Sequence, residues 1–156
     1  MSKILIVDDD PAVKTLIERL MALKGHEWVA AESGKAALDI IDFEIFDLII
    51  TDLRMQNMDG MELLRKVRRL TPNIPVIMVT AYSSTDTTLA AVQLGVFDYL
   101  AKPFKVDDLN AAVEQALAAG KGKTRAADQY TGNNPTIKAY LARQAGVRPA
   151  QQTPAS

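Results

Sequence analysis

Five short apolar runs, separated by stretches with helical periodicity, constrain the fold of this chain more than any other feature. The runs are Ile4–Val7, Trp28–Ala31, Leu48–Ile50, Val76–Val79 and Phe97–Leu100. They are mostly continuous rather than alternating, which is typical of strands covered on both faces. Strands that alternate with helices indicate a parallel sheet with right-handed crossovers. We therefore predict an α/β fold with a doubly wound, five-stranded parallel sheet and five helices.

The residues between these runs support the same arrangement. Asp10-Pro11 is typical of a helix start, and Ser33 can cap the second helix. Ser83, with Asp86 three residues later, resembles a capping box for the fourth helix. The fifth helix is expected over about Val106–Ala119. The most economical strand order for five such units is the flavodoxin-like order 2-1-3-4-5.

The charge balance of the chain changes after residue 119. Residues 1–119 hold 12 Lys+Arg and 18 Asp+Glu, a balance of −6, and residues 120–156 hold 6 Lys+Arg and 1 Asp, a balance of +5. We predict one domain over 1–119 and a linker or tail over 120–156, largely irregular, with a short helix near 135–144. The acidic main body is not expected to bind nucleic acid, and the tail is interpreted as a solvated linker.

Several classes of protein are excluded by what the sequence lacks. The chain has no cysteine, which excludes disulfides, thiolate metal sites and cysteine nucleophiles. The apolar run at the N-terminus is far too short for a signal peptide or a membrane span, so we expect a cytoplasmic protein without membrane contact. An ATP-binding glycine-rich loop is missing, which argues against a kinase. The tail has no helix-turn-helix pattern long enough to bind DNA.

Polar side chains follow the strands at the points where they end. Asp8 and Asp9 follow the first run, Asp52 the third and Thr80 the fourth, and Lys102 follows the fifth. In a doubly wound sheet these ends converge on one crevice. Each residue alone has an ordinary structural explanation, such as a helix cap or a surface lysine. Their joint occurrence at four strand ends makes chance improbable.

Three carboxylates in one pocket repel one another and need a cation, a shared proton, or both. Oxygen ligands without histidine or cysteine favour Mg²⁺ or Mn²⁺ over zinc. Lys102 and the metal could neutralise phosphoryl oxygens, and Thr80 could donate a hydrogen bond to them. The nucleophile would be a carboxylate, because the lone histidine, His26, lies in a turn far from these strand ends. The pocket therefore predicts phosphoryl chemistry.

Several segments together carry a resemblance to a known family. In chain order they are Ile4–Asp10, Asp47–Met55, Met58-Asp59-Gly60, Pro75–Ala81 and Asp98–Phe104. Over about residues 2–119, in unbroken order, the chain closely resembles receiver domains of bacterial two-component response regulators, most of all those of the enhancer-binding type.

The resemblance implies a function for the acidic cluster. Asp52 would accept a phosphoryl group from a sensor histidine kinase or a histidine phosphotransfer protein. Asp9 and Asp52 would bind Mg²⁺ directly, Asp8 would act largely through water, and the backbone carbonyl of Arg54 would add a ligand. The chain would be a signalling switch rather than an enzyme, with only self-catalysed phosphorylation and dephosphorylation.

The resemblance also implies a switch next to the acceptor. Thr80 and Tyr99 resemble the family's switch pair, and Lys102-Pro103 resembles its lysine followed by a cis proline bond. Drawing Thr80 inward would move the start of the fourth helix and let Tyr99 turn into the space. We expect a homodimer or a partner to use the face of the fourth helix, fifth strand and fifth helix. That face is expected near Leu89–Leu94, Tyr99 and Lys105–Leu109.

Two questions stay open at the level of sequence. Thr131–Ile137 faintly resembles the start of the ATPase module of enhancer-binding regulators, but no Walker A sequence follows it. The chain is expected to be either a single-domain regulator or a piece of a longer one.

An aspartyl phosphatase of the haloacid-dehalogenase class is the alternative function; it would use Asp8 as nucleophile and need an acidic pair after a later strand. A flavin module would need a phosphate loop where Asp8–Asp10 stand.

Overall fold

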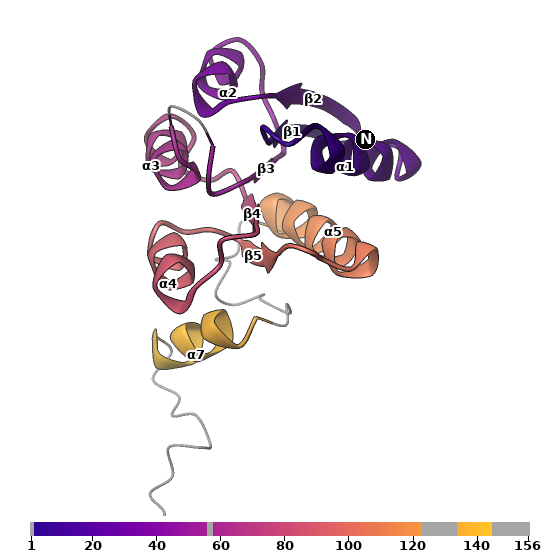
Figure 1. Cartoon of the computed structure of the whole chain (residues 1–156). Coiled ribbons are helices and arrows are strands. Elements are labelled where there is room, and N and C mark those ends of the chain that lie inside the picture. The colour runs from indigo at the N-terminus through magenta and orange to yellow at the C-terminus, as the bar shows by residue number, and fades with distance from the viewer. Residues whose placement is uncertain (1, 56–57, 123–133, 145–156) are drawn as a thin grey trace, which may run out of the picture.

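A single parallel sheet organises the molecule. The computed structural model describes residues 2–55, 58–122 and 134–144. Its strand order is β2-β1-β3-β4-β5, as predicted (Figure 1). The strands are β1 (Lys3–Val7), β2 (Glu27–Ala31), β3 (Leu48–Thr51), β4 (Val76–Thr80) and β5 (Asp98–Ala101). Because all five run in the same direction, their carboxyl ends lie along one edge of the sheet.

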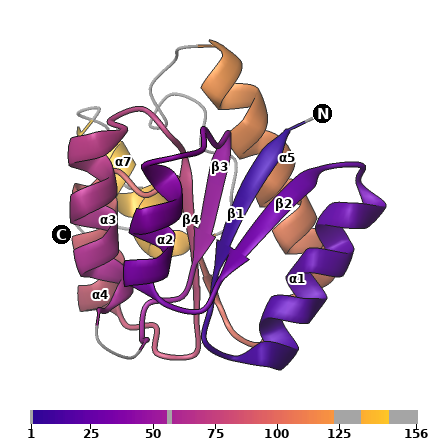
Figure 2. The same ribbon diagram turned by 90° about the horizontal axis from the view of Figure 1, so that it is seen from above.

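Helices cover both faces of this sheet, as expected for a doubly wound fold. They are α1 (Pro11–Leu23), α2 (Gly34–Ile41), α3 (Gly60–Leu70), α4 (Thr85–Gln93), α5 (Val106–Gly122) and α7 (Pro135–Gln144). Helices α1 and α5 pack on one face, and α2, α3 and α4 on the other (Figure 2). None of the helices within the described ranges is long and apolar enough to cross a membrane.

The central strands explain why the apolar runs are continuous. Along β1, Leu5 and Val7 join the core beneath α2 and α3, whereas Ile4 and Ile6 join the core beneath α1 and α5. Ile4, Leu5 and Ile6 have no exposed surface. Both faces of the strand are therefore apolar, and the polar residues are left for the strand ends.

The helix starts follow the expected capping chemistry with one correction. The side chains of Asp10 and Ser33 accept hydrogen bonds from backbone N–H groups in the first turns of α1 and α2. For α4 the cap is Ser84, not Ser83. Ser84 has extended backbone angles and accepts from the N–H of Thr87, whose side chain completes the capping box. Two adjacent serines offer the same chemistry, and the backbone geometry of the second one decides between them.

Arg68 on α3 fixes the far end of α4. Its guanidinium donates to the carbonyl oxygens of Leu94 (3.0 Å), Ile74 (2.5 Å) and Gly95 (2.7 Å). Leu94 is the C-cap of α4, and Gly95 follows it with a φ of 81°, a backbone angle that favours glycine. The carbonyl group of the α4 C-cap and that of the glycine after it are thus bound by one side chain of the neighbouring helix.

The tail contributes an ordered helix. Helix α5 continues through Gly122, three residues beyond the expected Ala119, and α7 occupies the range expected for a short tail helix. Ile137 on α7 is 2% exposed and belongs to the core cluster around α3 and α4, so this part of the tail is packed and not a solvated linker. The rest of the tail lies outside the described residues, as do the first residues of the segment Thr131–Ile137. The division at residues 119 and 120 stays a prediction.

Candidate functional site

The acidic cluster lies where the sequence places it, at the carboxyl ends of two paired strands. Val7 of β1 pairs with Thr51 of β3, so Asp8 and Asp52 follow neighbouring positions of the sheet. Carboxylate oxygens of Asp8, Asp9 and Asp52 lie within 4.8 Å of one another. Asp8 is 2% exposed and Asp52 6% exposed, whereas Asp9 faces solvent. The cluster is thus a pocket with two buried carboxylates and a third at its opening.

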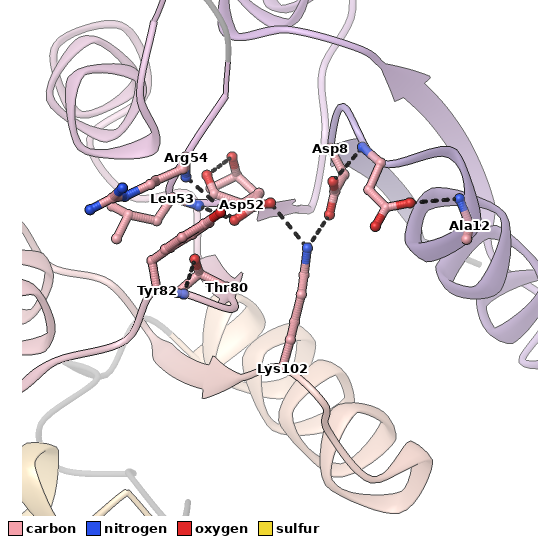
Figure 3. A network of polar contacts seen from close by, with 10 residues as sticks. Asp8, Ala12, Asp52, Leu53, Arg54, Thr80, Tyr82 and Lys102 are labelled. Atoms are coloured by element: carbon pink, nitrogen blue, oxygen red, sulfur yellow. Dashed lines mark hydrogen bonds and ion pairs between the residues drawn. The ribbon is translucent and has the colours of Figure 1, made fainter.

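Lys102 joins the two buried carboxylates. Its Nζ lies 2.9 Å from Oδ2 of Asp8 and 3.0 Å from Oδ2 of Asp52, between the two side chains in Figure 3. Burial by itself would lower the pKa of Lys102, but the hydrogen bonds and negative charges of Asp8 and Asp52 outweigh it, and the net effect raises the pKa. The lysine is therefore held in its charged form among the acids.

The Asp52 side chain is oriented by the backbone that follows it. Its Oδ1 accepts a short hydrogen bond from the N–H of Leu53 (2.6 Å) and a longer one from Arg54 (3.4 Å). Gly60 packs against the same turn: a Cβ there would lie 2.2 Å from the carbonyl oxygen of Asp52. The turn that carries Asp52 can therefore close only because residue 60 has no side chain.

Asp8 has both oxygens occupied by protein groups. Oδ1 accepts from the N–H of Asp10 (2.8 Å), and Oδ2 contacts Lys102. Burial raises the pKa of Asp8 and the charge of Asp52 adds to that effect; the bonds from Lys102 and Asp10 lower it, yet the net shift is upward. The charged form of Asp8 is thus less favourable in the pocket than in water, and a bound cation would offset part of this cost.

Thr80 ends β4 beside this pocket. It has no exposed surface, and its Oγ1 accepts a hydrogen bond from the N–H of Tyr82 (3.1 Å). The exposed Tyr82 ring stacks on the guanidinium of Arg54, which lies 4.3 Å from the ring centre. Arg54 and Tyr82 follow Asp52 and Thr80 by two residues each in the sequence. Their direct contact could not be read from it.

Tyr99 lies farther from the acids. Its ring is 2% exposed, and its hydroxyl is 3.0 Å from Oγ1 of Thr87 on α4. Burial raises the pKa of the hydroxyl. In this structure Tyr99 is therefore already buried. From the sequence, we expected it to turn inward only when Thr80 moves. Three residues after Tyr99, the peptide bond between Lys102 and Pro103 is cis.

The residues fit a hard divalent cation. Three carboxylates within reach of one point, one of them solvent-accessible, offer oxygen donors only, and Mg²⁺ or Mn²⁺ prefer such donors. Asp9 is the member at the opening, so a hydrated ion can reach it without rearranging the core.

Comparisons with known proteins agree with this geometry. Residues 4–114 match the model of the response regulator receiver domain family. The transcriptional regulatory protein ZraR of Escherichia coli is 39% identical over 149 residues, and the DNA-binding transcriptional regulator NtrC of Klebsiella pneumoniae is 35% identical over 147 residues. These alignments cover 96% and 94% of this chain but only 32% and 30% of the relatives. The chain thus spans about a third of their length.

Solved structures show the same likeness. A receiver domain protein of Clostridium thermocellum superposes with a TM-score of 0.74 at 32% identity, over 80% of this chain and 100% of that one. A CheY-like receiver domain protein of Methanospirillum hungatei gives 0.76 at 31% identity, over 80% and 99%. Since the sequence match, the sheet topology and the acidic pocket all agree, this chain belongs to the response regulator receiver domain family of two-component signalling.

Proposed function

We propose that Asp52 is the phosphoryl acceptor of this receiver domain and that the donor is a sensor histidine kinase or a histidine phosphotransfer protein. The observation that carries the proposal is the shared contact of Lys102 with Oδ2 of Asp52 and Oδ2 of Asp8. It puts a positive charge beside a carboxylate that is buried, oriented by the backbone and next to a candidate metal site. Phosphoryl transfer needs this combination of positioning and positive charge.

The two oxygens of Asp52 have different surroundings, and this suggests which one reacts. Oδ1 is held by the N–H of Leu53, whereas Oδ2 contacts the end of the long Lys102 side chain. We expect Oδ2 to form the bond to phosphorus while the bond from phosphorus to the donor's histidine nitrogen breaks and its electron pair returns to the imidazole ring. Lys102 can then follow the new charge onto a phosphoryl oxygen.

Asp9, Asp52 and the backbone carbonyl of Arg54 would hold Mg²⁺, with Asp8 acting through water. The contacts of both Asp8 oxygens with Asp10 and Lys102 support this indirect role. The bound ion supplies positive charge that neutralises the phosphoryl oxygens.

Phosphorylation is proposed to change the structure through Thr80 and Tyr99. A phosphoryl group adds nearly two negative charges and strong acceptor oxygens. Thr80 could turn its hydroxyl toward them, and in doing so would disturb the bond that it accepts from Tyr82, just before α4. The output is then control of a partner or of a downstream module. We do not expect this chain itself to bind nucleic acid, although its relatives are transcriptional regulators.

Labelling with acetyl phosphate and Mg²⁺ tests the assignment. Intact mass should show one phosphoryl group on the wild type and none on Asp52→Asn. Asp47→Asn is the matched control, because Asp47 lies at the opposite end of β3 and accepts from the N–H of Lys3. Asp8→Asn separates the two functions: if it abolished labelling while Asp52→Asn kept the wild-type rate, Asp8 would be the nucleophile, as in the haloacid-dehalogenase class.

A further inference from the structure

Helix α7 lies on the face of α4 and β5 that we expected a homodimer or a partner to use. It packs on α4, and the two helices lie side by side in Figure 1. Ile137 is buried in the core cluster that includes Ala91 and Val92 of α4, and Tyr140 and Leu141 pack against the same cluster. The apolar side of α7 therefore packs on α4. It covers a surface of α4 that a second copy of this chain would need for dimerisation through this face.

Asn134 attaches the start of α7 to the sheet. Its Oδ1 accepts from the N–H groups of Thr136 (3.0 Å) and Ile137 (3.2 Å), which caps the helix, while its Nδ2 donates to the carbonyl of Tyr99 (3.1 Å). Among the described strands β5 is an edge strand, so this carbonyl faces away from the sheet ladder. One side chain thus fixes both the helix end and its position on β5.

The same tyrosine connects α7 to α4. The Tyr99 backbone binds Asn134, and the Tyr99 hydroxyl lies 3.0 Å from Thr87 in the first turn of α4. Helix α7 therefore contacts two elements, α4 and β5, and its position depends on both. The segment leading into α4 is in turn bonded to Thr80, at the rim of the Asp52 pocket.

We propose that α7 is an internal cover of the α4–β5 surface, docked while Asp52 is unphosphorylated and released when the pocket is occupied by a phosphoryl group. This inference rests on the function proposed above. If phosphorylation shifts the start of α4 relative to β5, α7 loses its fit on one of the two. Coupling between two sites is reciprocal, so a docked α7 must also oppose occupation of the pocket. Dimerisation through this face then requires α7 to leave.

Three variants of the full chain separate docking from folding. Ile137→Asp puts a charge into the α7 contact. Lys138→Asp is its matched control, because Lys138 is exposed on the same helix. Asn134→Gly is a milder variant: glycine caps a helix almost as well as asparagine, so this change mainly removes the bond to Tyr99. It keeps the test valid if Ile137→Asp does not fold.

The probe is beryllofluoride with Mg²⁺, read by amide hydrogen exchange and by titration. In the wild type, α7 amides should be protected before the probe is added and lose protection at saturation. Ile137→Asp should bind the probe about tenfold more tightly than the wild type, Asn134→Gly a few-fold more tightly, and Lys138→Asp equally, which is within the usual range of coupled sites.

The outcomes distinguish this inference from the proposed function. A wild type that binds the probe at Asp52 and keeps α7 fully protected would overturn the inference alone. The same holds if it dimerises through the α4–β5 surface with α7 still protected. A wild type that does not bind the probe at all would overturn the proposed function, and the inference with it.

Discussion

The two ends of the sheet differ in a way that explains where function can reside. At the amino end lies an apolar hollow of about 390 Å³, lined by side chains such as Ile41, Phe46 and Ile74. Phe43 and Ile45 project beside it and are 88% and 90% exposed. At the carboxyl end two buried carboxylates, those of Asp8 and Asp52, lie close together.

Their charged groups are also arranged differently. At the amino end Lys3 pairs with Glu44 at 3.1 Å, one base with one acid, and both side chains are about a third exposed. At the carboxyl end Lys102 is shared by Asp8 and Asp52, and all three are largely buried. The direction of the strands thus determines where reactive groups converge.

The largest difference in stability should come from two glycines. Gly60→Ala, at the carboxyl end, puts a Cβ against the backbone of Asp52 and should cost about 3 kcal/mol or more. Gly25→Ala, before β2 at the amino end, has open space for a Cβ and a φ of 77°, so only backbone strain opposes it, about 1 kcal/mol. Urea unfolding measures both. Equal losses would contradict the close approach at residue 60.

The lysines at the two ends form the next comparison. Lys102→Met leaves Asp8 and Asp52 facing each other without compensation, and should cost about 2 kcal/mol in the absence of metal. Lys3→Met removes a half-exposed pair and should cost about 0.5 kcal/mol. Added Mg²⁺ should recover part of the loss in Lys102→Met and none in Lys3→Met. If Mg²⁺ left both unchanged, the cation site would be misplaced.

Asp9 should affect binding more than folding. It is exposed, so Asp9→Asn removes a metal ligand and a negative charge without disturbing the core. We expect Mg²⁺ affinity to fall at least about tenfold, with phosphorylation falling in parallel. The metal-free protein should become slightly more stable, since carboxylate repulsion is relieved. Calorimetric titration with Mg²⁺ checks the first effect, and unaltered affinity would remove Asp9 from the site.

The smallest effect is expected at the amino-end hollow. Ile45→Ser changes a side chain that is 90% exposed, so the free energy of unfolding should stay within about 0.5 kcal/mol of the wild type. Labelling of Asp52 should be unchanged. A large loss of either would show that this end of the sheet is coupled to the pocket, and the contrast between the two ends would fail.

The sheet and the acidic cluster could be predicted because both depend on local patterns. An apolar run such as Ile4–Val7 predicts a strand on its own, and the parallel direction then brings Asp8 and Asp52 together. The family resemblance added the roles of individual residues, which stay predictions until they are measured.

Contacts between distant parts of the chain could not be predicted from such local patterns. Asn134 and Tyr99 are 35 residues apart, and neither residue type predicts the hydrogen bond between them. The choice between Ser83 and Ser84 as cap depends on backbone angles, and two adjacent serines give no sign of these angles in the sequence. In the same way, the contact of the buried Tyr99 with Thr87 on α4 depends on how that helix packs on the strand.

Arg68 gives α4 a fixed end and a movable one. Its three bonds to Ile74, Leu94 and Gly95 fasten the C-terminus of the helix to α3, on the side away from the acceptor. At the other end, Ser84 and Thr87 bond to each other through exposed, short-range contacts, and within the described residues the one longer-range bond of either side chain is that of Thr87 to the Tyr99 hydroxyl. Any shift that begins near Thr80 would therefore turn α4 as a lever about Leu94, with the longest travel at Ser84 and almost none beside Arg68.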